Sequence, residues 1–217
     1  MVNFLLLIEE ITQYNKEIIN RGLTPQKVYE LCSCIRETFC LSYSIRKNNN
    51  LFFYFQKEHI LVSFIGSELR HLGPDERSQA LLLEKALNKA NGINFIEKDG
   101  SKQSTPGIYI LKFLDHPSFH RYIQSLIEGT VYLVIDNEEF IKKERDIYAP
   151  NINIEFFIDR NLFIIPTYDN FIDNSKILTL FKEMKKIKFL SLSKIKQIEN
   201  KILYINYRKD HQDSVQL

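Results

Sequence analysis

Cysteine is scarce in this sequence of 217 residues, and its scarcity excludes two classes of structure. Cys32, Cys34 and Cys40 are an odd number of cysteines clustered in one segment, so they do not form a disulfide framework. No second cysteine pair and no nearby histidine accompany Cys32 and Cys34, so we expect no zinc site and no other metal site. We therefore expect free thiols in a reducing compartment.

Long apolar runs are also missing. The N-terminal run FLLLI has five residues, which is too short for a signal sequence or a membrane span. No other segment reaches a spanning length. We expect a cytoplasmic protein that makes no membrane contact.

The net charge is only +2, but the charges are distributed unevenly along the chain. Residues 181–209 contain nine lysines and arginines against two acids, so this segment carries +7 and the remainder −5. A basic segment on a near-neutral body suits a polyanion such as RNA, with Lys185, Lys186 and Lys188 as candidate phosphate contacts. A solvated lysine face is the alternative explanation.

Hydrophobic periodicity predicts alternating strands and helices. We expect strands at 2–8, 51–55, 60–66, 108–114, 131–135, 162–166 and 187–192. We expect helices at 24–45, 74–91, 119–129 and 170–185, a loop at 96–107, and either a strand or a helix start at 201–207. Such alternation favours an α/β fold with a mainly parallel sheet, helices on both faces, and a single domain over residues 1–217.

The stretch GSELRHLGPDERS, residues 66–78, is dense in charge and links an expected strand to an expected helix. Asp75 and Glu76 complement a helix N-terminus, which explains two of the charges structurally. Capping does not explain Glu68, Arg70 and Arg77. If the loop lies at the carboxyl ends of parallel strands, as we expect, these side chains can clamp a phosphate and hydrogen-bond a base edge. A well-anchored helix start remains the alternative explanation for each residue.

Three stretches resemble, in order and spacing, the archaeal tRNA pseudouridine-54 N1-methyltransferases. They are LCSCIRETFCLSYSIRK at 31–47, GSELRHLGPDERSQALLLEKAL at 66–87 and STPGIYI at 104–110. The middle stretch is the most specific. The match continues weakly through VYLVIDNEEF, where the family has a strand followed by an acidic turn.

This resemblance implies a SPOUT methyltransferase with a C-terminal trefoil knot. It implies S-adenosyl-L-methionine as cofactor, tRNA as substrate, a homodimer, and methyl transfer to N1 of a T-loop pseudouridine. On the residues that match, it implies Arg70 and Arg77 for RNA and for the anion formed at the base, Glu68 and Asp75 for base orientation or proton acceptance, and Ser78 as a cap or phosphate donor.

The C-terminal part departs from the family pattern, because the 88 residues after Gly129 contain no glycine. The positions nearest the family's cofactor loops are Ile165, Ser193 in place of a glycine, and either Lys201 or Ile202, of which we take Ile202. Glycine lets backbone approach a ligand closely, so its loss bears on cofactor binding. Three hypotheses follow: an active methyltransferase, a catalytically silent paralogue that binds RNA, and an enzyme with a different RNA or small-molecule substrate.

Overall fold

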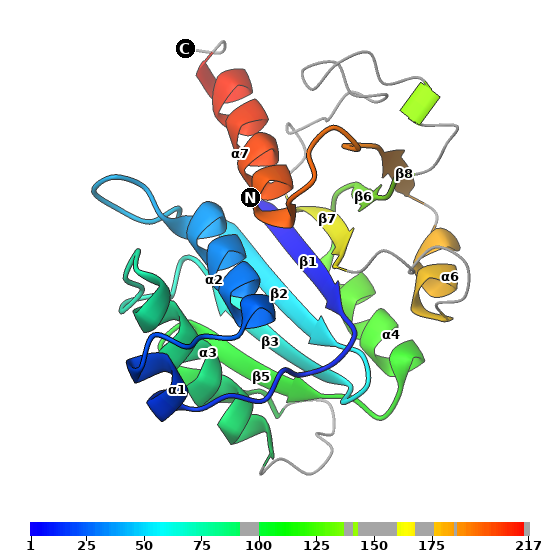
Figure 1. Cartoon of the computed structure of the whole chain (residues 1–217). Coiled ribbons are helices and arrows are strands. Elements are labelled where there is room, and N and C mark those ends of the chain that lie inside the picture. Colours follow the sequence, from blue (N-terminus) through cyan, green and yellow to red (C-terminus); the bar gives the residue numbers. More distant parts are fainter. Residues whose placement is uncertain (92–99, 137–140, 143–159, 168–175, 185, 215–217) are drawn as a thin grey trace.

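Strands and helices alternate along most of the chain, as the periodicity predicts (Figure 1). The computed structural model describes residues 1–91, 100–136, 141–142, 160–167, 176–184 and 186–214. The strands are β1 (Val2–Ile8), β2 (Asn49–Phe55), β3 (Ile60–Ile65), β4 (Lys102–Thr105), β5 (Ile108–Lys112), β6 (Val131–Val134), β7 (Asn161–Pro166) and β8 (Ile187–Leu190). The helices are α1 (Lys16–Asn20), α2 (Gln26–Phe39), α3 (Glu76–Asn91), α4 (His116–Leu126), α6 (Lys176–Lys182) and α7 (Ile198–Ser214).

The eight strands form one sheet in the order β4-β5-β3-β2-β1-β7-β6-β8. From β2 to β8 the neighbours run parallel, whereas β3, β5 and β4 form an antiparallel half. The predicted mainly parallel sheet is therefore confirmed, with an antiparallel extension on one side. The extension follows from chain length, because the four residues between β2 and β3 suffice for a hairpin but not for a parallel crossover.

Strand β1 lies in the middle of the sheet, and all seven of its residues are buried. A central parallel strand is covered on both faces, which explains its continuous apolar run. One face packs against α2, α3 and α7, and the other against α4 and α6 (Figure 1). The sheet is thus covered by helices on both faces, as predicted.

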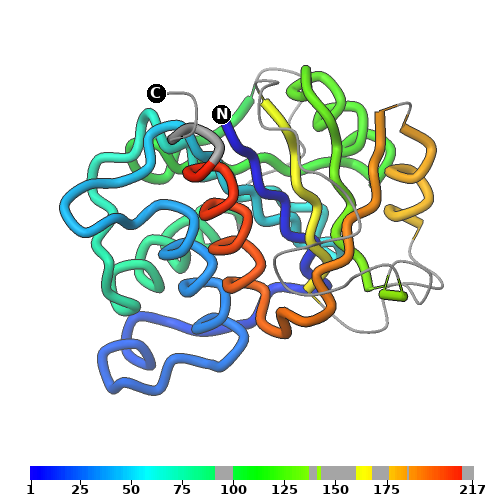
Figure 2. The backbone as a smooth tube through the Cα atoms, turned by 90° about the horizontal axis from the view of Figure 1, so that it is seen from above, coloured from blue at the N-terminus to red at the C-terminus, as the bar shows by residue number. Residues whose placement is uncertain are grey.

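Helix α7 packs alongside α2 on one face of the sheet (Figure 2). Buried Asn206 of α7 accepts a hydrogen bond from Asn49 Nδ2 at 2.9 Å and donates to the Glu37 carbonyl oxygen at 2.9 Å. At the surface, Arg46 donates two hydrogen bonds to the Asp210 carboxylate, at 2.8 and 2.7 Å. These contacts join the C-terminal helix to the N-terminal half of the chain.

Several element boundaries differ from the sequence prediction. Helix α2 ends at Phe39 rather than near residue 45, and the loop predicted at 96–107 contains the edge strand β4. The segment 201–207 is part of helix α7. The predicted helix at 170–185 lies partly outside the described residues, which show its stretch Lys176–Lys182 as α6.

Candidate cofactor pocket and RNA-contact loop

The charged loop at 66–78 follows β3, and its location differs from the prediction. Because β3 runs antiparallel to β2, Ile65 pairs with Asn50 near the start of β2. The Gly66 backbone N–H accordingly donates to the Asn49 carbonyl oxygen at 3.0 Å. The loop therefore lies at the amino ends of the parallel strands, and the prediction that it lies at their carboxyl ends was wrong.

The first part of this loop is held tightly against β5. Leu69 is buried, and its backbone passes so close to Gly107 that a Cβ on Gly107 would lie 2.5 Å from the Leu69 nitrogen. Gly107 also has φ of +82°, which glycine adopts without strain. Glu68 accepts a hydrogen bond from the Tyr109 hydroxyl, and this bond raises the pKa of Tyr109. The STPG turn thus shapes the loop, and the Tyr109 hydroxyl holds the exposed Glu68 carboxylate in place.

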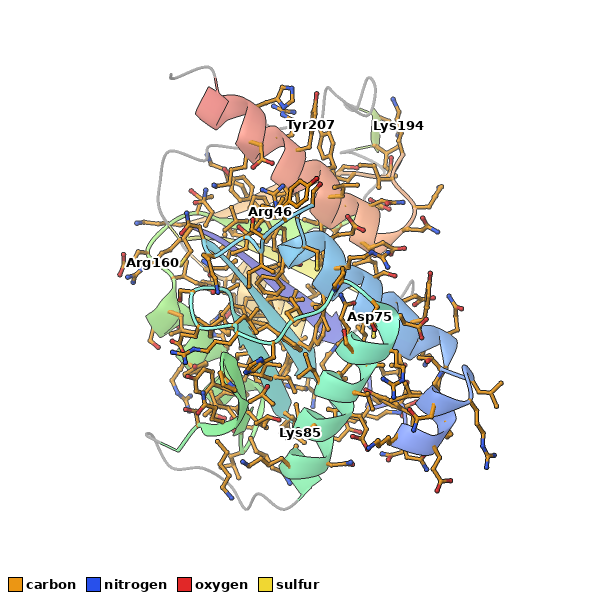
Figure 3. All side chains as sticks on the ribbon, turned by 90° about the vertical axis from the view of Figure 1, so that its left-hand side faces the viewer. Arg46, Asp75, Lys85, Arg160, Lys194 and Tyr207 are labelled. Carbon is orange, nitrogen blue, oxygen red and sulfur yellow. The ribbon has the colours of Figure 1, made fainter. Side chains whose placement is uncertain are left out.

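The second part of the loop leads into helix α3, and Asp75 directly precedes the first residue of the helix (Figure 3). The Asp75 carboxylate accepts the Ser78 backbone N–H at 2.8 Å, and the Ser78 hydroxyl donates to the Asp75 carbonyl oxygen at 3.0 Å. The hydrogen bond from the Ser78 backbone N–H to the carboxylate is the main cause that lowers the pKa of Asp75. Both residues therefore cap the helix.

The two arginines of the loop have different surroundings. Arg77 donates from Nη2 to Asn20 Oδ1 at 2.8 Å and so links α3 to α1. Arg70 is exposed and has no side-chain partner among the residues that the structure describes. Of the predicted RNA contacts in this loop, Arg70 is thus the one available for an anion without breaking an existing contact.

The predicted lysine contacts lie at the β8 edge of the sheet, several strands away from the charged loop. Lys186 precedes the edge strand β8 and is exposed, while Lys188 lies within β8. Lys185 lies outside the described residues. Five strand spacings separate β3 from β8, which is about 24 Å at 4.8 Å per spacing. An RNA that contacts both Arg70 and Lys188 of one chain must span that distance.

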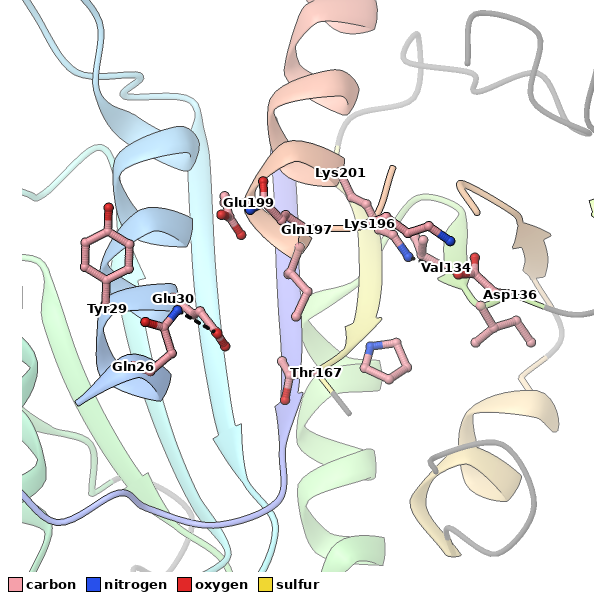
Figure 4. A pocket seen from close by; sticks show the side chains of 13 residues that line it. Gln26, Tyr29, Glu30, Val134, Asp136, Thr167, Lys196, Gln197, Glu199 and Lys201 are labelled. Carbon is pink, nitrogen blue, oxygen red and sulfur yellow. Dashed lines mark hydrogen bonds and ion pairs between the residues drawn. The ribbon is translucent and has the colours of Figure 1, made fainter. Parts of the chain in front are cut away.

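A pocket of about 450 Å³ opens at the carboxyl ends of β6 and β7 (Figure 4). Its walls are the first turn of α2, the residues that follow β6 and β7, and the start of α7. The lining residues are Gln26, Tyr29, Glu30, Val134, Ile135, Asp136, Pro166, Thr167, Lys196, Gln197, Ile198, Glu199 and Lys201. Ligands of open parallel sheets bind at this edge, beyond the carboxyl ends of the strands.

Charges of both signs line this pocket. Lys201 Nζ lies 3.5 Å from the Asp136 carboxylate, and only 12% of the Lys201 side chain is exposed. Glu30 accepts a hydrogen bond from Gln26 at 3.1 Å on the facing helix α2. Lys196 and Glu199 complete a set of two cations and three carboxylates. Such a set can bind a ligand that carries both a carboxylate and a cationic group.

The three predicted cofactor residues lie beside this pocket rather than on its walls. Ile165 and Ile202 are buried in the apolar core, but each adjoins a lining residue in sequence, Pro166 and Lys201 respectively. Ser193 lies in the segment between β8 and α7, three residues before Lys196. The polar lining residues were not predicted from the sequence, although Asp136 and Thr167 directly follow expected strands, where a ligand contact is expected.

The remaining expectations concern thiols, metals and membranes. The structure gives all three cysteines as free, and burial raises the pKa of Cys32 to about 12, which leaves it unreactive. Within the described parts of the chain, no group of three or more metal-ligating side chains comes together. None of the described helices has the length and apolar character of a membrane span.

Comparison with known proteins identifies relatives along most of the chain. A family model described as "Putative SAM-dependent RNA methyltransferase" matches residues 10–153. A tRNA (pseudouridine(54)-N(1))-methyltransferase of Methanocaldococcus jannaschii is 30% identical over 154 residues, which are 67% of this chain and 69% of the relative. The protein of the same name from Methanococcus aeolicus is 29% identical over 185 residues, 77% of this chain and 84% of the relative. That of Haloferax volcanii is 48% identical over 59 residues, 27% of this chain and 29% of the relative.

Proposed function

The chain belongs to this family of S-adenosylmethionine-dependent RNA methyltransferases, and on that premise we propose that it methylates N1 of a pseudouridine in the T-loop of tRNA. The observation that carries the proposal is the charged pocket at the carboxyl ends of β6 and β7. This pocket offers a binding place for the methyl donor, and that argument is independent of the resemblance of the charged loop to the family. A tRNA substrate and free thiols also favour a cytoplasmic location.

The residues of the pocket fit S-adenosylmethionine. Lys196 and Lys201 complement the cofactor's carboxylate, while Glu30, Asp136 and Glu199 complement its ammonium group and accept hydrogen bonds from ribose hydroxyls. The volume of about 450 Å³ lies within the usual range for a cofactor pocket. When bound, the cofactor supplies a methyl group on a positively charged sulfur.

The loop at 66–78 provides the groups that the target base requires. N1 of pseudouridine carries a proton, and its loss leaves negative charge on the ring. Arg70, which is exposed, can stabilise that charge, and Glu68 can orient the base or accept the proton. The contacts of Asp75, Ser78 and Arg77 within the chain make them positioning residues for this loop.

The distance between loop and pocket supports a homodimer. The loop lies where β2 begins, and the pocket lies at the end of the sheet where β2 finishes. The six steps between the seven residues of β2 span about 20 Å at 3.3 Å each. One chain therefore does not bring Arg70 next to its own pocket, whereas the loop of a second copy can reach it. The half-exposed apolar residues Tyr29 on α2 and Leu203 and Tyr207 on α7 offer a surface for that copy.

The strand order supports the proposed trefoil knot. Strands β6, β7 and β8 follow one another in the sequence, but β6 lies between β7 and β8 in the sheet. The chain must therefore cross over β6 after leaving β7. We infer that the segment from about Leu162 onward passes through a loop of its own backbone, a rare arrangement in proteins.

A methyl-transfer assay tests the proposed function. The substrate is a T-arm RNA hairpin that carries pseudouridine at the target position, with methyl-labelled S-adenosylmethionine. Mass spectrometry of the digested RNA should show one methyl group at N1 of that nucleoside. The matched control is the same hairpin with uridine, in which N1 is bonded to the ribose and cannot accept a methyl group.

The glycine-free stretch after Gly129 favours one alternative function, a silent paralogue that binds RNA. Calorimetric titration with S-adenosylmethionine separates the two. Methylation of the hairpin and binding of S-adenosylmethionine, observed together, support the hypothesis of an active enzyme. Hairpin binding with neither cofactor binding nor methylation contradicts it and supports the paralogue.

A further inference from the structure

A second cavity, of about 360 Å³, lies on the face of the sheet that carries α4, and we call it the α4 groove. Its floor is made by side chains of adjacent strands, and the C-terminal half of α4 forms one wall. The residues that matter here are Asn50, Phe52, Ser63, Tyr109, Tyr122 and Leu126. The α4 groove lies at the amino ends of the parallel strands, whereas the charged pocket lies at their carboxyl ends.

The α4 groove contains the buried hydroxyl of Ser63. Ser63 lies between Phe52 and Tyr109 in one cross-strand row, so the three side chains share a face of the sheet. Only 4% of Ser63 is exposed, and its Oγ is buried without a hydrogen-bond partner among the described residues. Leaving a buried hydroxyl unpaired is unfavourable, and an apolar residue would fill this position in a strand without that cost. The hydroxyl therefore points to a ligand in the groove.

Aromatic rings flank this hydroxyl. Phe52 and Tyr109 lie on either side of Ser63, and Tyr122 of α4 packs its ring at 5.4 Å from that of Phe113. The Tyr122 hydroxyl has no hydrogen-bond partner among the residues that the structure describes. Flat aromatic surfaces with a few polar groups are the environment in which proteins hold an unstacked base.

The α4 groove is joined directly to the charged loop. The Tyr109 hydroxyl donates to Glu68, and the Gly66 backbone N–H donates to Asn50 Oδ1 at 3.2 Å. A nucleotide held in the groove would therefore lie next to the loop that carries Arg70. The occupant that matches both the rings and the adjoining arginine is an unpaired nucleotide of RNA.

We propose that the α4 groove binds one unpaired nucleobase of the RNA substrate, stacked on its aromatic side chains and hydrogen-bonded to Ser63. This inference rests on the proposed function only in taking RNA as the substrate. The base is a neighbour of the methylated one along the RNA, because Glu68 and Arg70 of the adjoining loop are the groups that we assign to the methylated base. Hydroxyl groups both donate and accept, so the groove selects an unpaired base with little preference for its identity.

A double-mutant cycle between protein and RNA tests the proposal. The protein variant is Tyr122→Leu, which keeps apolar packing but removes the ring. The RNA variants are T-arm hairpins in which each loop nucleotide in turn is made abasic. Binding is measured by fluorescence anisotropy without cofactor. One abasic position should weaken binding to the wild type by roughly fivefold or more, and should weaken binding to Tyr122→Leu hardly at all. Additive effects at every position would overturn the proposal.

The control for this cycle is Tyr14→Leu, a partly buried tyrosine that packs on the opposite face of the sheet. It should show the same response to each abasic hairpin as the wild type. If Tyr122→Leu instead changes the molar mass by light scattering, the groove is an interface between copies, and the proposal fails.

Ser63→Ala gives a second, independent test. It should weaken hairpin binding about three- to tenfold while leaving the melting temperature unchanged or raised, because the hydroxyl has no partner in the part of the chain that the structure describes. The control Ser33→Ala removes a buried serine hydroxyl on α2, on the other face of the sheet, and should leave binding unchanged. Equal binding by wild type and Ser63→Ala would overturn the proposal.

Crosslinking distinguishes a failure of this proposal from a failure of the proposed function. Hairpins with 5-iodouridine in the loop should crosslink to Tyr109 or Tyr122, as mapped by peptide mass spectrometry, whether or not the protein transfers methyl groups. Crosslinks confined to residues outside the groove would overturn the proposal even if methylation proceeds.

Discussion

Asp75 and Ser78 form a reciprocal pair at the start of α3: the carboxylate accepts the Ser78 backbone N–H at 2.8 Å, and the Ser78 hydroxyl donates to the Asp75 carbonyl oxygen at 3.0 Å. The pair satisfies a helix N–H that has no partner within the helix. It also places a negative charge at the positive end of the helix dipole. The acids of the charged loop thus have a structural task, separate from any contact with RNA.

Replacing this cap should lower stability. Asp75→Ala should reduce the free energy of unfolding by about 0.5–2 kcal/mol, because it removes the N-cap acceptor. In a chain of this size each kcal/mol lowers the melting temperature by about 2–4 °C. Thermal denaturation followed by circular dichroism provides the measurement. Asp75→Asn keeps a good cap and should lose much less, and equal losses for both variants would contradict the capping role.

The pH dependence of this difference follows from the lowered pKa of Asp75. A carboxyl group whose pKa is lower in the folded state stabilises the protein above its unfolded pKa, which is about 3.9. That stabilisation is lost as the pH falls through the lower, folded pKa. The gap in melting temperature between wild type and Asp75→Ala should therefore be constant above about pH 5 and shrink below about pH 4. A gap that widens in acid would contradict this assignment.

The sequence predicts the core elements of this fold well and the site less well. The run at 2–8 predicts a central buried strand, and β1 is completely buried. The charged loop was placed at the wrong edge because strand direction cannot be read from composition. The four residues between β2 and β3 are too short for a parallel crossover, and that length would have corrected the error.

The charged pocket illustrates what the sequence cannot predict. Glu30, Asp136, Thr167 and Lys201 come from four separate segments of the chain, and the sheet order alone brings them together. From the resemblance to the family, Ile165 and Ile202 are the predicted cofactor contacts. They adjoin lining residues in the sequence, but both are buried in the core. Within a strand or helix, neighbouring residues face different directions, so an error of one position replaces a pocket residue with a core residue.

Arg70 and Arg77 should differ in their effects on the enzyme, although both belong to the same motif. Arg70→Ala should slow single-turnover methylation about ten- to a hundredfold with no change in melting temperature, because it removes a charge-assisted contact to RNA. Arg77→Ala should slow it less and lower the melting temperature slightly, because Arg77 is bound to Asn20. A larger rate loss for Arg77→Ala would show that the Asn20 contact gives way to RNA.

Lys186 and Lys188 should bind RNA in a way that depends on salt rather than on sequence. The double variant Lys186→Glu/Lys188→Glu should weaken tRNA binding and reduce the slope of log K against log salt by roughly 0.7–0.9 for each phosphate that is no longer neutralised. Binding by filter retention at four or more salt concentrations gives that slope. Lys85→Glu, an exposed lysine on α3, is the control for general charge reversal (Figure 3). An unchanged slope would place the RNA away from β8.

Lys201 should be required for cofactor binding, because it is a mostly buried cation in the charged pocket. Its Nζ lies 3.5 Å from Asp136, so the ammonium group is held in place before a ligand arrives. Lys201→Met keeps the apolar length of the side chain and removes only the charge. We expect it to weaken binding of S-adenosylmethionine about ten- to a hundredfold in calorimetric titration.

The demethylated product S-adenosylhomocysteine carries the same carboxylate but no positive sulfur, so its binding should weaken by the same factor. Lys85→Met serves as the control and should bind both ligands like the wild type. A loss confined to one ligand would show that Lys201 contacts something other than the carboxylate, and no loss for either would remove it from the cofactor site.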